Sequence, residues 1–164
     1  MRNLIIFSIL IFICGDVSSM EVSGDCKNGD YSTSASACIE VEDVNFDCNR
    51  GTGFLKNQYS SCSSRISYIT EVSWDKDRDN QNHNEDYNQL RVEIECWQSV
   101  KIDYKAGPIT LSDHVTFQDE DYFYVSYSDY ERGYFDIYYD LSFKGVFRAD
   151  VRSVKCWVSD LDPS

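Results

Sequence analysis

Hydrophobic and polar residues alternate along much of the chain beyond residue 38. The alternation is strictest at 90–96, where apolar side chains stand at every second position between charged ones. These apolar positions are Leu90, Val92, Ile94 and Cys96. A period of two predicts an antiparallel strand that buries one face. We expect further strands at 38–46, 65–74, 99–104, 109–117, 121–127, 134–144 and 146–158.

The segments between these strands are rich in Ser, Gly, Asp and Asn. We interpret 20–37 as an irregular N-terminal segment, and 47–64 and 75–88 as loops. No stretch of a dozen residues repeats its apolar positions with the period of a helix. Tyr, Phe, Val and Ile, which favour strands, are abundant. The pattern therefore predicts an all-β protein: a single domain, 20–164, folded as an antiparallel β-sandwich.

The first 19 residues have the pattern of a secretory signal peptide. Arg2 is followed by an apolar run over 4–14, and small residues precede the expected cleavage site at 19. The run is too short to cross a bilayer, which needs about 20 residues. We expect residues 1–19 to be removed, and the mature chain to be extracellular without a membrane span.

Cysteine usage agrees with export. Of seven cysteines, Cys14 leaves with the signal peptide and six remain. An even number in an exported chain predicts three disulfides, whose pairing the sequence leaves open among 15 possibilities. Zinc is disfavoured because the chain has no C-x-x-C spacing and only two histidines. The six cysteines are Cys26, Cys38, Cys48, Cys62, Cys96 and Cys156.

The formal net charge is −13, and removing residues 1–19 leaves it unchanged because Arg2 and Asp16 cancel. Nucleic acids and anionic membranes are therefore unexpected partners, since both bind basic surfaces. A basic protein or peptide, or a cation, complements this charge.

Signs of catalysis are weak. The chain has no nucleophile elbow, phosphate-binding loop or zinc-protease motif. The neighbours Ser112, Asp113 and His114 are better explained as a turn, because the members of a catalytic triad converge from different elements. We expect neither enzymatic activity nor a cofactor.

One acidic loop could bind calcium, which needs six to eight oxygen ligands. Its candidate ligands are Asp75, Asp77, Asp79 and Asp86. The spacing departs from an EF-hand, and Lys76 and Arg78 offset its charge, so a solvated loop is the simpler interpretation. If the loop binds calcium, the alternative function is a calcium-dependent carbohydrate-binding module or a small hydrolase.

The strongest feature other than cysteine is the segment 118–140, in which acidic residues and tyrosines are interleaved. Tyrosine is enriched in binding hot spots, and carboxylates attract a basic partner. Alternate tyrosines could equally pack in the core or pair across strands, and because a strand pair has two faces both can hold. The candidate ligand-binding residues are Asp119, Glu120, Asp121, Tyr122, Tyr124, Asp129, Tyr130 and Glu131.

The strand 90–96 and the tracts 122–128 and 134–142 resemble the secreted immune-evasion β-sandwiches of poxviruses, including the chemokine-binding domain attached to some viral receptors for tumour necrosis factor. The resemblance covers roughly 45–158 and rests on strand and cysteine patterns, so no individual site residue transfers. It implies a sandwich that sequesters basic chemokines or related immune ligands. The leading hypothesis is a secreted, monomeric binding protein without catalysis; a secreted structural or effector protein is a further alternative.

Overall fold

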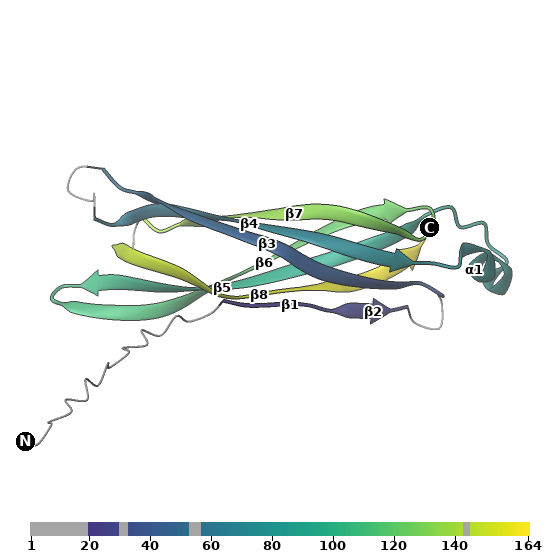
Figure 1. The fold of residues 1–164 in the computed structure, drawn as a ribbon, viewed down its shortest axis with the longest axis horizontal. Coiled ribbons are helices and arrows are strands. Elements are labelled where there is room, and N and C mark those ends of the chain that lie inside the picture. The colour runs from purple at the N-terminus through teal and green to yellow at the C-terminus, as the bar shows by residue number, and fades with distance from the viewer. Residues whose placement is uncertain (1–19, 30–32, 53–56, 143–144) are drawn as a thin grey trace, which may run out of the picture.

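Two four-stranded sheets pack face to face in an elongated sandwich, with one short helix at one end (Figure 1). This arrangement is seen in a computed structural model that describes residues 20–29, 33–52, 57–142 and 145–164. The expected signal peptide, 1–19, lies outside the described residues. The elements are β1 (Glu21–Gly24), β2 (Cys26–Asn28), β3 (Ser36–Arg50), β4 (Tyr59–Ser73), α1 (Lys76–His83), β5 (Leu90–Ala106), β6 (Ile109–Val125), β7 (Asp129–Asp140) and β8 (Val146–Pro163).

The sheet that we call sheet A has the strand order β1-β8-β5-β6, and sheet B has the order β2-β3-β4-β7. Among the described strands, β1 and β8 run parallel and every other hydrogen-bonded pair is antiparallel. The predicted fold class, a β-sandwich with three disulfides, is confirmed. Within the described part of the chain, no helix is long and apolar enough to cross a membrane.

The core forms where the alternating apolar side chains of the two sheets meet. The even positions of β5 point inward, and Leu90, Val92 and Ile94 are fully buried. From sheet B, Ile66 and Phe135 meet them, and both are buried as well. Removing such side chains from water is the main force that holds two sheets together.

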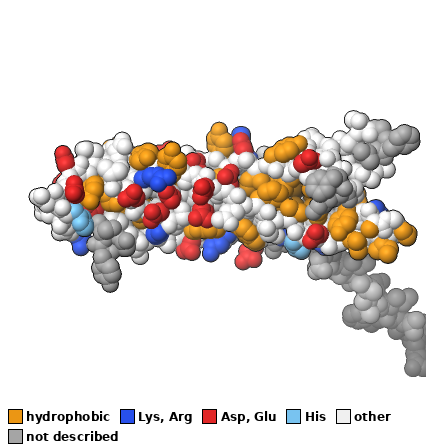
Figure 2. Space-filling view, turned by 180° about the vertical axis from the view of Figure 1, so that it is seen from behind, with side chains coloured by type: hydrophobic (Ala, Val, Ile, Leu, Met, Phe, Trp, Pro, Cys, Tyr) orange, Lys and Arg blue, Asp and Glu red, His pale blue; other side chains and the backbone are white. Residues whose placement is uncertain are grey.

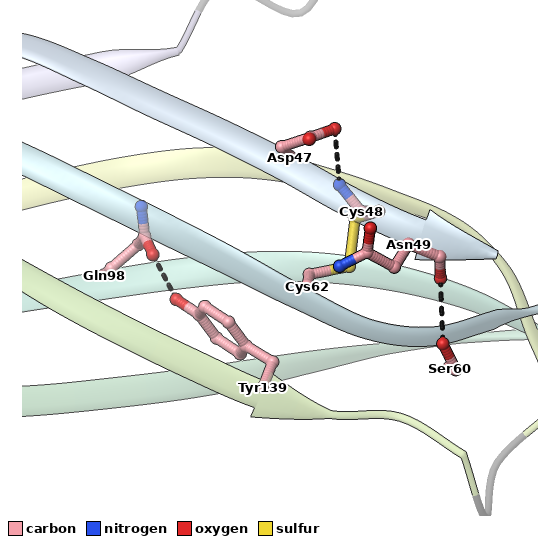
Figure 3. Close-up of a disulfide and its surroundings, with 7 residues drawn as sticks. All are labelled: Asp47, Cys48, Asn49, Ser60, Cys62, Gln98 and Tyr139. Carbon is pink, nitrogen blue, oxygen red and sulfur yellow. Dashed lines mark hydrogen bonds between the residues drawn. A yellow bond between two sulfur atoms is a disulfide. The ribbon is translucent and has the colours of Figure 1, made fainter.

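Two predicted pairs of strands are single long strands, β5 and β6. The segments 90–96 and 99–104, for example, are both parts of β5. The break in alternation between them arises because Gln98 occupies a core position. The fully buried Gln98 amide donates to Ser64 Oγ at 2.8 Å and accepts a hydrogen bond from the Tyr139 hydroxyl (Figure 3). A buried polar group is tolerated when it is bonded in this way, so Gln98 joins sheet A to sheet B without interrupting the strand.

Each disulfide joins directly opposed residues of two neighbouring antiparallel strands. The bonds are Cys26–Cys38 between β2 and β3, Cys48–Cys62 between β3 and β4, and Cys96–Cys156 between β5 and β8. All three lie within a sheet, so the cohesion between sheets depends on core packing and on polar links such as the Gln98 bonds and the contact of Lys27 on β2 with Asp160 on β8. Three disulfides favour an oxidising compartment, such as the outside of the cell.

The expectation of an irregular segment at 20–37 is wrong in part, because β1 and β2 lie there. Both strands are short and polar, and pairing with β8 and β3 imposes their conformation. The chain passes from sheet A to sheet B between them. Gly24 permits this crossing, since a Cβ at that position would lie 2.0 Å from the carbonyl oxygen of Ile39.

The two predicted loops are also shorter than expected. Within 47–64, β3 continues to Arg50 and β4 begins at Tyr59, and the Cys48–Cys62 bond fixes this pairing. Within 75–88, the chain forms α1. This helix is eight residues long and lacks an apolar stripe, so its sequence carries no helical period.

Candidate functional site

The acidic, tyrosine-rich segment 118–140 is divided between two strands that belong to different sheets. Its first part lies on β6, which forms one edge of sheet A, and its second part lies on β7, which forms one edge of sheet B. The two strands follow each other in the chain and are not hydrogen-bonded as a pair. The candidate residues therefore line one side of the sandwich rather than one flat sheet face.

On β6, the candidate carboxylates point in two directions. Asp119 and Asp121 pair with Cys96 and Ile94, both buried, and so lie on the side of β6 that faces sheet B. They remain exposed because β6 is the edge strand. Glu120 alternates with them and points to the outer side, as do Tyr122 and Tyr124 on the same strand.

The outer side of β6 carries a shallow cavity of about 240 Å³. It is lined by Arg91 and Glu93 of β5 and by Glu120, Asp121 and Tyr122 of β6. The Arg91 guanidinium lies 4.5 Å from the centre of the Tyr122 ring and forms an ion pair with Glu93. The Arg91 guanidinium thus covers one face of the Tyr122 ring.

On β7, Asp129 and Glu131 pair with the buried residues Val72 and Thr70. Both carboxylates are exposed, again because the strand is an edge. Tyr130 points to the outer side, where its hydroxyl donates to Glu71 at 2.9 Å. This hydrogen bond raises the pKa of Tyr130 above its usual value.

Carboxylates from the two strands approach the same buried side chain, Tyr68 of β4. Burial, together with the smaller effect of the charges of Asp121 and Glu131, raises the pKa of Tyr68 to about 12. Asp121 belongs to β6 and Glu131 to β7, so both strands contribute negative charge to one region. We call the eight candidate residues together the β6–β7 edge; they are Asp119, Glu120, Asp121, Tyr122, Tyr124, Asp129, Tyr130 and Glu131.

Three of these residues are exposed tyrosines. The exposed fractions are 53% for Tyr122, 50% for Tyr124 and 62% for Tyr130. The rings of Tyr122 and Tyr124 meet edge to face, with centres 5.8 Å apart. Figure 2 shows one broad face of the molecule, on which acidic side chains and hydrophobic ones, tyrosine included, are interspersed and basic ones are fewer.

The outer side of β7 carries further aromatic groups that our choice of candidate residues omitted. Tyr134 and Tyr138 are exposed, and Asp136 lies between them. Arg65 donates two hydrogen bonds of 2.7 Å to Asp136 and stacks 4.5 Å from the centre of the Tyr134 ring. The guanidinium lowers the pKa of Asp136. The period-two pattern of 134–140 could have identified this outer side of β7. Phe135 is buried, so Tyr134, Asp136 and Tyr138, which alternate with the buried positions, must point outward.

The candidate calcium ligands at 75–86 are held apart by α1. Asp75 caps the helix and accepts a hydrogen bond from the backbone of Arg78 at 3.1 Å, while Asp77 and Asp86 are exposed to solvent. Asp79 is buried and already bonded within the protein. Within the described ranges, no group of three or more His, Cys, Asp or Glu side chains is arranged to hold a metal ion.

Asp79 instead anchors α1 to the sandwich. Its carboxylate accepts hydrogen bonds from the Trp74 indole at 2.9 Å, the Thr33 hydroxyl at 2.9 Å and the Ser34 backbone at 2.8 Å. Burial alone would raise the pKa of this carboxyl, but the hydrogen bonds outweigh burial and the net shift is downward. The carboxylate thus has a structural role in joining three segments.

The fold and this surface define the protein as a disulfide-bonded β-sandwich with an acidic, aromatic side. No protein-family model, curated protein or solved structure matches the chain. The two-sheet architecture with three disulfides that the poxvirus resemblance implied is present, and the comparisons assign no family.

Proposed function

We propose that the protein is a secreted, non-enzymatic binding protein that uses the β6–β7 edge to hold a basic protein or peptide. The observation that carries the proposal is the exposure of tyrosines beside carboxylates on two neighbouring edge strands. Exposed aromatic side chains that gather in a patch rimmed by polar groups are typical of an interaction site. In the bound state that we propose, the basic ligand covers these tyrosine rings.

The chemistry of the edge suits a basic partner. Tyrosine offers a large contact area and loses little conformational entropy when it is fixed. Carboxylates beside it accelerate and orient the approach of a positively charged surface. Residues 109–131 contain eight carboxylates or tyrosines of the β6–β7 edge and no lysine or arginine, so nothing basic on this segment opposes such a partner.

The ligand class follows from the resemblance to poxvirus immune-evasion domains. Chemokines and related immune ligands are small and basic, as the acidic edge requires. A chemokine or another basic immune ligand is therefore our first choice of ligand.

The test compares two triple variants that remove the same charge. The first is Asp119→Asn, Glu120→Gln and Asp121→Asn. The second, a control, is Glu40→Gln, Asp43→Asn and Asp86→Asn, which changes exposed side chains on β3 and in the loop after α1. Binding of the oxidised mature chain to a panel of basic secreted proteins is measured by calorimetry.

We expect the first variant to weaken binding and the control to leave it nearly unchanged. We also expect wild-type affinity to fall as salt is raised from low to physiological concentration, because exposed charges are screened beyond about 8 Å at physiological ionic strength. Equal losses in both variants would show that net charge alone attracts the ligand. An affinity that is independent of salt, or that survives the first variant, refutes the proposal.

A further inference from the structure

The free edge of β6 is a second feature of the acidic side, distinct from its side chains. Strand β6 pairs with β5 over all its 17 residues without a register shift. No described strand pairs with its other side. An unpaired edge of this length presents a row of backbone N–H and C=O groups that can accept another strand.

The register determines which backbone groups of β6 are free. The Cα atoms of Cys96 and Cys156 lie 4.1 Å apart, the spacing of a pair that exchanges no backbone hydrogen bonds. The backbone groups of Cys96 therefore point away from β8 and toward its partner on β6, Asp119. Because these directions alternate along a strand, the odd residues of β6 bond to β5 and the even residues point to the free edge.

Hydrogen bonds of the even residues agree with this assignment. The free N–H groups of His114, Glu120 and Tyr122 each donate to the carboxylate of the aspartate that precedes them. The distances are 2.8, 3.0 and 2.8 Å. Each aspartate thus covers one free N–H group of the edge.

The same arrangement recurs at other unpaired edges. Asp129 accepts a hydrogen bond of 2.8 Å from the N–H of Tyr130 on β7, and Asp47 accepts one of 2.9 Å from Cys48 near the end of β3 (Figure 3). Charged side chains at an edge are a known protection against pairing with a second copy of the same chain. If a second copy of the chain paired with β6 through the same edge, the carboxylates of the two copies would lie close together and repel each other.

An extended segment rich in lysine or arginine is hindered neither by the aspartates that cover the free N–H groups nor by repulsion between like charges. Its carbonyl groups can accept the hydrogen bonds of the free N–H groups, while its lysines or arginines pair with the displaced carboxylates. The backbone N–H group and the aspartate carboxylate, which bond to each other in the free edge, then each bond to the added strand. Opposite charges across neighbouring strands stabilise the pairing, and like charges oppose it.

From this geometry we infer that the β6 edge binds an extended basic segment as an additional strand of sheet A, with cations at alternate positions facing Asp119 and Asp121. This mode is β-augmentation, in which backbone bonds supply affinity and alternate side chains supply specificity. The inference rests on the proposed function and specifies how a basic partner would be held.

The decisive variants change one free N–H group and keep every charge. Thr116 is an exposed even residue of β6 whose N–H points to the free edge. Thr116→Pro removes that N–H without removing a bond to β5, and proline is tolerated on an edge strand. Thr116→Ala is the matched control, because it loses the same side chain and keeps the N–H. The probe is a peptide of alternating lysine and threonine.

We expect the probe to bind wild type and Thr116→Ala alike, and to bind Thr116→Pro at least about tenfold more weakly, since backbone pairing is interrupted at the centre of the strand. A peptide of alternating glutamate and threonine should not bind. Equal binding to both Thr116 variants overturns the inference but leaves the proposed function standing. Absence of probe binding to wild type overturns the inference as well, and the panel of basic proteins then decides the proposed function separately.

Hydrogen exchange on the wild-type chain gives a result that does not depend on how well the proline variant folds. Augmentation should slow exchange at the even amides, such as those of Thr116 and Gln118, when the probe is added. Binding through side chains alone would leave these amides unprotected and contradict the inference. Concentration-dependent dimerisation with the same protection, in the absence of probe, would identify a second copy as the occupant and also overturn it.

Discussion

Replacing Asp79 by asparagine removes the charged acceptor that holds α1 against the sandwich. The carboxylate is 2% exposed and serves donors on three residues, Trp74, Thr33 and Ser34. Asparagine keeps one oxygen and presents an NH₂ group in place of the other. Whichever way the amide turns, its NH₂ faces a group that can only donate, either the Ser34 N–H or the Trp74 indole N–H.

The magnitude follows from the bonds that are lost. A hydrogen bond to a charged group contributes about 1.5–3 kcal/mol, and a buried donor without a partner costs about 1–3 kcal/mol. We therefore expect Asp79→Asn to lower the free energy of unfolding by about 2–4 kcal/mol. For a domain of this size each kcal/mol corresponds to roughly 2–4 °C in Tm, so the melting temperature should fall by roughly 4–16 °C.

The assay is urea unfolding of the oxidised protein, followed by circular dichroism at neutral pH. The matched control is Asp77→Asn, which changes an exposed carboxylate on the same helix. Its only expected loss is a favourable interaction with the helix dipole, about 0.3–1 kcal/mol. If the two variants lose the same stability, the account of Asp79 as a buried anchor is wrong.

The Asp79 contribution should also depend on pH. The pKa of Asp79 lies below its usual value in the folded protein. The contribution is therefore fully present above the pKa of the unfolded chain, about 3.9, and is lost as pH falls through the folded pKa. The stability difference between wild type and Asp79→Asn should shrink in acid; a difference that stays constant to low pH would contradict this reasoning.

Three further predictions concern the sandwich core. Gly133→Ala should lower stability by about 1–3 kcal/mol in urea unfolding, because a Cβ would lie 2.2 Å from the Tyr68 hydroxyl oxygen; unchanged stability would contradict that contact. Tyr68 should ionise only at about pH 12 in a spectrophotometric titration read against Tyr68→Phe, and its contribution to stability should be lost as pH rises from about 10 to that value. Tyr139→Phe leaves a buried Gln98 oxygen without its donor and should cost about 1–3 kcal/mol, with part of the loss recovered when Gln98→Met is added.

The candidate site was predictable as a segment but not as a surface. Alternation placed Tyr122 and Tyr124 on one side of a strand, and composition marked 118–140 as acidic and aromatic. Whether this segment forms a hairpin within one sheet or connects two sheets depends on which strands pair with β6 and β7. Strand β6 pairs with β5, which directly precedes it in the chain, whereas β7 pairs with β4, which lies far away in the sequence. The local pattern therefore carries no information about the partner of β7.

Asp79 shows a second limit of the sequence. In the chain it resembles its neighbours Asp75 and Asp77, and the three together suggested a calcium loop. The fold buries one, makes another a helix cap and leaves the third in solvent. Identical side chains acquire different roles because burial and hydrogen-bond partners are set by segments such as 33–35, which are remote in the sequence.

The sequence by itself determined the fold class, because period-two alternation and strand-favouring residues are local properties. A strand with this alternation buries its apolar side chains only when that face packs against another layer. It also determined that six cysteines remain after residue 19 and that the domain is acidic. The tertiary structure alone decided the pairing of those cysteines, the continuity of β5 through Gln98, and the placing of β6 and β7 at the edges of opposite sheets. These features depend on contacts between segments that are distant in the sequence. Such contacts form only when the whole chain packs, so no local stretch of sequence specifies them.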